Sequence, residues 1–200
     1  MKVGGFVKLI YKGKYRSEQD LPTRIHPEGH VPFREASDMK KLAMLLNCIS
    51  IPMLILTMVG FILRGQVYVL DRPLGVSLGM IGSFLILFPH ELLHALCFKG
   101  EVELWTNLKM GMLFVVGTED MSKSRFVWMS MLPNLVFGWV PYVLFLLNPQ
   151  WVFLGALGAF AIPMGIGDYY NVYNCVTQVP KGALVYLSGM HSYWYVPKMS

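Results

Sequence analysis

The residues best suited to chemistry lie in the stretch LILFPHELLHALCF, which contains His90-Glu91-Leu-Leu-His94. Residues four apart on a helix lie on one face about one turn apart, so both imidazoles can bind one ion. Glu91 follows the first histidine directly, where its carboxylate can serve as general base toward a water beside that ion. The spacing therefore predicts a Zn²⁺ site with His90 and His94 as ligands and Glu91 as the catalytic base.

Four long apolar stretches carry this motif and make up much of the chain. Of the 200 residues, 54% are hydrophobic and only 14% are charged, which is unusual for a soluble globular domain. The stretches cover about 45–63, 75–98, 127–147 and 151–167, and each has roughly the length of a helix that crosses a bilayer. The sequence predicts an all-α membrane protein with about four transmembrane helices.

A third metal ligand is expected, because a catalytic zinc normally has three protein ligands and one open position. A scan of these stretches for Asp, Glu, Lys, Arg and His finds only the HELLH residues and, at the end of the fourth stretch, Asp168. Such groups are costly in a bilayer and usually mark a functional site or an internal pair. We therefore predict Asp168 as the third ligand. Asn134, in MLPNLVF, is predicted to steady a substrate carbonyl or to orient a ligand, although an interhelical hydrogen bond alone would also explain it.

The basic residues predict how the chain crosses the membrane. All of the 17 Lys and Arg residues except Arg64 and Arg72 precede the first span, follow the last, or lie between the second and third. Because such residues stay on the cytoplasmic side, both termini and the middle loop are expected there, in the cell membrane. The HELLH motif and Asp168 then reach a similar depth near the cytoplasmic face. The bias also explains the net charge of +5 without a nucleic-acid partner.

The polar segments divide the chain further. We expect a cytoplasmic N-terminal region over 1–41, whose short extended runs allow a hairpin, and a transmembrane core over 42–168. Within that core, 100–124 is predicted to form a cytoplasmic hairpin. The tail, over 169–200, is predicted to contain another pair of short strands.

Several other features have simple structural explanations. His26 and His30, in HPEGH, are four apart, but an intervening Pro and Gly predict a solvated loop rather than a helix. His191 is isolated and expected at a surface. The glycines of GALGAFAIPMGIGD predict close helix packing, and Pro163 predicts a kink that could help to deliver Asp168. The HELLH residues themselves could form a structural hydrogen-bonded cluster between helices.

The order of these features resembles that of site-2 proteases, which cut proteins within or beside the membrane. A helix with HELLH precedes a loop with a hairpin, a helix with an internal Pro-Asn, and a helix that ends in Asp. The stretches FPHELLHALCF, GIGDYYNVYN and VPKGALVYLSG are similar to those of a zincin peptidase family of small bacterial membrane proteins. This likeness covers most of the chain from about Ala43 onward.

The resemblance implies a site-2-protease-like three-helix core, in which His90, His94 and Asp168 bind Zn²⁺ and Glu91 is the base. One feature departs from the pattern. Site-2 proteases usually place this Asp in Asn-Pro-Asp-Gly, whereas here a Tyr follows Asp168. Nearby Asn171 could donate a hydrogen bond to a metal ligand without binding the metal itself.

We therefore expect an integral-membrane zinc metallopeptidase whose partners are the bilayer and membrane or membrane-proximal protein substrates. A substrate strand could add to an exposed edge of the 100–124 hairpin. Two alternatives stay open, a non-catalytic metal-binding scaffold and an ion or proton pathway. The pathway is less favoured, because all the ionisable groups lie near one face and the outer half of the bilayer has none.

Overall fold

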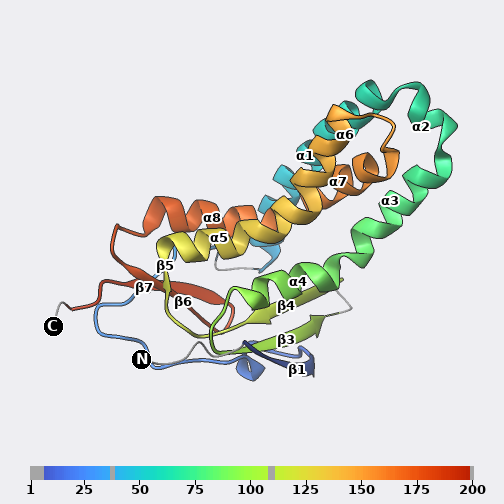
Figure 1. Ribbon diagram of the computed structural model, residues 1–200. Coiled ribbons are helices and arrows are strands. Elements are labelled where there is room, and N and C mark those ends of the chain that lie inside the picture. The colour runs from blue at the N-terminus through green and yellow to red at the C-terminus, as the bar shows by residue number, and fades with distance from the viewer. Residues whose placement is uncertain (1–6, 37–38, 108–110, 199–200) are drawn as a thin grey trace. The chain divides into compact units, whose positions relative to one another are not determined.

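A computed structural model describes residues 7–36, 39–107 and 111–198, and Figure 1 shows the elements. The chain forms two compact units. Unit 1 contains 1–35, 91–130 and 171–200, and unit 2 contains 36–90 and 131–170. Three helices, α4 (Leu87–Leu96), α5 (Lys123–Asn134) and α8 (Ile166–Gln178), have residues in both units.

Unit 2 is helical. Its elements are α1 (Met39–Gly65), α2 (Val67–Asp71), α3 (Pro73–Leu85), a π-helix (Leu135–Trp139), α6 (Val140–Leu147) and α7 (Val152–Met164), with the adjoining ends of α4, α5 and α8. Small residues let these helices approach closely: Cβ at Gly79 of α3 would lie 2.5 Å from the Phe153 carbonyl oxygen of α7. Thr57 of α1 donates to the Ala159 carbonyl of α7 at 2.8 Å.

Two to four segments are long and apolar enough to cross a membrane. Lys40–Gly65 and Lys123–Leu147 qualify as single helices. The pairs α3 with α4 and α7 with α8 qualify only if each bent pair is one span, with bends of 45° and 51°. The coarse expectation of a mostly helical chain with apolar spans is therefore confirmed.

The predicted second and fourth spans are not single straight helices. α3 ends at Leu85, and Pro89 explains the break, because a proline has no N–H for the carbonyl four residues earlier and its ring clashes with that carbonyl. α7 ends at Met164, after Pro163, and α8 then continues to Gln178. The expectation of a helix that ends at Asp168 is thus wrong, since Asp168 lies in the first turn of α8.

Unit 1 contains two small sheets, so the prediction of an all-α protein was too narrow. One sheet has the order β1-β3-β4, with β1 (Lys8–Lys14) parallel to β3 (Glu101–Asn107) and β3 antiparallel to β4 (Met112–Val116). The strand pair expected within 100–124 is confirmed. Residues 108–110, between these strands, lie outside the described part of the chain.

The second sheet has the order β2-β7-β6-β5. Its strands are β2 (Val31–Pro32), β7 (His191–Tyr195), β6 (Leu184–Ser188) and β5 (Met121–Ser122). The antiparallel β6–β7 pair confirms the strands expected in the tail. The N-terminal hairpin is wrong, because β1 and β2 pair with distant segments rather than with each other. A three-residue 3₁₀ helix (Glu18–Asp20) lies between them in the chain.

A buried apolar cluster joins the elements of unit 1. Ala95 of α4, Phe98, Val102 of β3, Phe126 of α5 and Val185 of β6 belong to it. Each is at most 4% exposed. The C-terminal half of the HELLH helix is therefore fixed against both a strand and a neighbouring helix.

Candidate metal centre

The HELLH residues lie on one helix, α4, as their spacing predicted. One ligand atom from each of His90, Glu91 and His94 lies within 4.8 Å of the other two. Glu91 and His94 are buried, and His90 is half-buried. The cluster thus offers two imidazoles and a carboxylate from adjacent positions of a single helix.

His94 is held in one tautomer by the backbone. Its Nδ1 lies 2.9 Å from the Met129 carbonyl oxygen, and a carbonyl can only accept a hydrogen bond. Nδ1 must therefore carry a proton, and in the neutral imidazole the lone pair is then on Nε2. Metal-binding histidines commonly donate their other N–H to a carbonyl in this way, which fixes the ring for coordination.

His90 faces the carboxylate predicted as its fellow ligand. Its Nε2 lies 3.1 Å from Asp168 Oδ2, although the two residues are 78 apart in the chain. Two ligand atoms on a tetrahedral zinc, each about 2.0–2.1 Å from the ion, are roughly 3.3 Å apart. The separation of His90 Nε2 and Asp168 Oδ2 therefore fits two ligands of one zinc ion.

Asn134 contacts the same carboxylate. Its Nδ2 donates a hydrogen bond to Asp168 Oδ2 at 2.7 Å, and the Asn134 side chain is 2% exposed. The residue stands at the end of α5, directly before the π-helix. π-helical turns are rare and often occur at functional sites.

Glu91 lies beside an edge strand. Its Oε2 accepts a hydrogen bond from the Val115 backbone N–H at 3.2 Å, so that N–H is directed away from the β3 partner strand. β4 is the terminal strand of its sheet. The candidate base is thus hydrogen-bonded to the outer edge of β4, and such edges are where an extended chain can pair.

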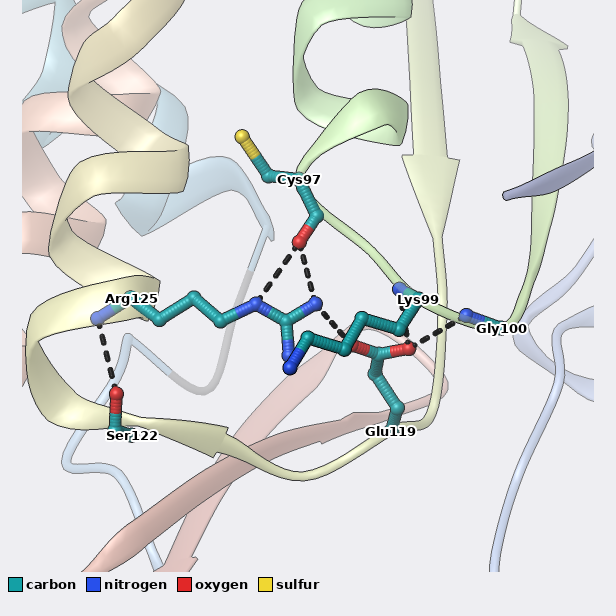
Figure 2. Close-up of polar contacts among 6 residues, drawn as sticks. All are labelled: Cys97, Lys99, Gly100, Glu119, Ser122 and Arg125. Carbon is teal, nitrogen blue, oxygen red and sulfur yellow. Dashed lines mark hydrogen bonds and ion pairs between the residues drawn. The ribbon is translucent and has the colours of Figure 1, made fainter. Parts of the chain in front are cut away.

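A network of polar contacts holds the chain at the C-terminal end of α4 (Figure 2). The Arg125 guanidinium donates from Nε and Nη2 to the Cys97 carbonyl and also pairs with the Glu119 carboxylate. Glu119 Oε2 accepts from the backbone N–H groups of Lys99 and Gly100, each at 2.8 Å. A helix end leaves carbonyls without intrahelical partners, and here a cation satisfies one of them.

The remaining candidates are not part of the HELLH cluster. His26 and His30 are exposed, and their rings stack with centroids 4.5 Å apart. His191 is also exposed, and its Nδ1 lies 3.4 Å from a Glu35 carboxylate oxygen. Asn171 is half-buried on α8, three residues after Asp168, and among the described residues its side chain has no hydrogen-bond partner.

Several contributors could not be recognised in the sequence. The Met129 carbonyl and the Val115 N–H are backbone groups, which every residue but proline has, so no residue type marks them. No sequence pattern marked Glu119 or Arg125 as a partner of α4. Their roles arise only when the chain returns to the end of α4.

A family model with the description "Putative zincin peptidase" matches residues 83–184, which is just over half of the chain. The matched region contains HELLH, Asn134 and Asp168. No curated protein and no solved structure matches the chain. Zincins are metallopeptidases that use zinc, which agrees with the donor set on α4. By this match, the chain belongs to the putative zincin peptidase family.

Proposed function

We propose that this protein is an integral-membrane zinc metallopeptidase that hydrolyses peptide bonds of membrane or membrane-proximal proteins. The observation that carries the proposal is the arrangement on α4. His94 is fixed in the metal-binding tautomer, and His90 Nε2 lies 3.1 Å from Asp168 Oδ2. The apolar helices that qualify as spans support a location in the membrane.

His90, His94 and Asp168 would hold the ion. When bound, zinc lowers the pKa of a water molecule toward neutrality and polarises a substrate carbonyl. Glu91 then acts as general base, taking a proton from the attacking water and giving it to the nitrogen of the leaving amine. Its hydrogen bond from Val115 keeps the carboxylate beside β4, where a scissile peptide could lie.

The substrate would bind as an added strand on β4. The Val115 N–H faces away from β3 and already donates to Glu91. Because strand orientation alternates, the Leu113 N–H also faces outward, and this is the group that a substrate carbonyl could accept from. An extended substrate can pair with this edge through its main chain, with little demand on sequence. A helical substrate segment would have to unwind first, since its amides are hydrogen-bonded within the helix.

Metal content tests the ligand set. The protein is purified in detergent, loaded with Zn²⁺, desalted, and analysed by inductively coupled plasma mass spectrometry. Wild type should hold one zinc per chain, and alanine variants of His90, His94 and Asp168 should lose it. His30→Ala is the matched control, because this exposed histidine lies outside the cluster, and it should retain the metal. Full zinc retention in Asp168→Ala would exclude Asp168 as a ligand.

Glu91→Gln tests the chemistry separately from metal binding. The amide cannot accept a proton, so this variant should keep zinc but lose cleavage by at least about 100-fold, as expected for removal of a general base. New protein N-termini would be measured by mass spectrometry in membranes from cells expressing wild type or Glu91→Gln. Identical N-termini in the two strains would contradict peptidase activity and favour a metal-binding scaffold.

A further inference from the structure

Gly165, at the junction of α7 and α8, lies directly against the Asn134 amide. A Cβ built at Gly165 would overlap Asn134 Oδ1 and lie 2.5 Å from its Cγ and 3.0 Å from its Nδ2. The backbone of Gly165 has φ −77° and ψ 15°, which any residue can adopt. Glycine is thus required here for space rather than for backbone conformation.

Asn134 has little room to move away from such a side chain. It is 2% exposed, follows Pro133 and precedes the π-helix. The first turn of α8 is also held to that π-helix, because Trp139 Nε1 donates to the Tyr169 hydroxyl at 3.0 Å. A side chain at position 165 would therefore displace the amide rather than separate the two segments.

Displacement of the amide would act on Asp168. The Nδ2 of Asn134 donates to Oδ2, the same oxygen that faces His90 Nε2. A carboxylate oxygen has two lone pairs, so one can accept the amide hydrogen while the other faces the second partner. The amide therefore sets the rotation of the Asp168 carboxylate about its Cβ–Cγ bond.

We propose that Gly165 and Asn134 form a positioning pair for the Asp168 carboxylate. The missing side chain at 165 leaves the space in which the Asn134 amide sits, and the amide presents Oδ2 to the metal site. This inference rests on the proposed function, because it concerns Asp168 as a metal ligand. It assigns to Asn134 the orientation of a ligand, and to one glycine of GALGAFAIPMGIGD a task beyond helix packing.

The test compares two glycine variants that differ by two positions. In Gly165→Ala the methyl group meets Asn134, whereas in Gly167→Ala nothing lies within 4 Å of the new Cβ. Zinc affinity is measured by competition with a chromogenic chelator, and the ligand field from the visible absorption of the Co²⁺-loaded protein. Residues that orient metal ligands typically contribute 10–100-fold in affinity. Gly165→Ala should lose roughly that factor and change the Co²⁺ spectrum, and Gly167→Ala should match wild type.

A double-mutant cycle separates this clash from a general packing defect. Asn134→Ala alone should also weaken zinc binding by about 10–100-fold. The double variant Gly165→Ala/Asn134→Ala has room for the new methyl group, so its affinity should equal that of Asn134→Ala, since coupled residues are not additive. The double variant also serves if Gly165→Ala does not fold.

The outcomes separate the two proposals. A wild-type protein that binds neither Zn²⁺ nor Co²⁺ would overturn the proposed function together with this inference. A wild type that binds zinc, with Gly165→Ala equal to it, would overturn the positioning role alone. A double variant that binds zinc much more weakly than Asn134→Ala would also overturn the positioning role.

Discussion

At the scale of residues, Glu35 links the protein's stability to pH. It lies in unit 1, close to His191. Burial raises the pKa of its carboxyl group, and hydrogen bonds from Ser192 and His191 oppose this shift only in part. Because the pKa is higher in the folded state than in the unfolded chain, the fold favours the protonated form. This stability contribution is complete below the unfolded pKa of about 4.5 and is lost as pH rises through the folded pKa.

Glu35→Gln should therefore become more stable relative to wild type as the pH increases from 4 to 8. The measurement is the thermal unfolding midpoint of both proteins in detergent across this range. Both are also compared in a His191→Ala background, which removes the neighbouring imidazole. If the unfolding midpoints with and without Glu35→Gln change in parallel with pH in that background, burial does not raise the pKa of Glu35.

Residue types with a regular spacing were predictable at this scale, and close contacts were not. The HELLH spacing predicted that His90, Glu91 and His94 come together on α4, because helical periodicity is local. The cost of a charged group near a bilayer singled out Asp168, which the structure places beside His90, and its role as a ligand stays a prediction. The contact of Gly165 with Asn134 depends on two helix ends meeting in space, so the sequence indicated only that glycines allow close packing.

At the scale of elements, the same distinction explains the helices and strands. Apolar length predicted the spans, but the bends after Leu85 and Met164 depend on prolines whose effect on helix direction is set by tertiary packing. Hydrophobic alternation marked β3 and β4, whereas the parallel pairing of β1 with β3 joins positions 93 residues apart, such as Lys8 and Glu101. Such partners cannot be chosen from local pattern.

The edge strand β4 provides a test at this scale. Leu113→Pro should remove an outward N–H while leaving the β3–β4 pairing intact, since proline is tolerated at strand edges. If substrates add to this edge, KM should rise several-fold with zinc content unchanged. Leu113→Ala, which keeps the N–H, is the control. An equal KM in the two variants would exclude main-chain pairing at Leu113.

At the scale of the whole molecule, the sheets constrain how the chain can cross a membrane. Two strands that pair directly must lie on the same side of the membrane, so the chain between them crosses the membrane an even number of times. β1 pairs with β3, on either side of α1 to α4, and β5 pairs with β6, on either side of α5 to α8. If α1 crosses, the bent α3–α4 pair must cross back, and the same reasoning applies to α5–α6 and α7–α8. The pairing thus favours four crossings among the two to four that length and composition allow.

The positions of the basic residues then predict which side unit 1 occupies. It holds most of the Lys and Arg residues, whereas Arg64 and Arg72 lie in unit 2 near the junctions of α1, α2 and α3. With positive charges inside, a green fluorescent protein fused after Ser200 should fluoresce in the cytoplasm. Alkaline phosphatase, which is active only outside, should be inactive after Ser200 and active when fused after Gln66. An active phosphatase after Ser200 would contradict the predicted orientation. Equal phosphatase activity in the two fusions would contradict the prediction that the chain crosses the membrane an odd number of times between Gln66 and Ser200.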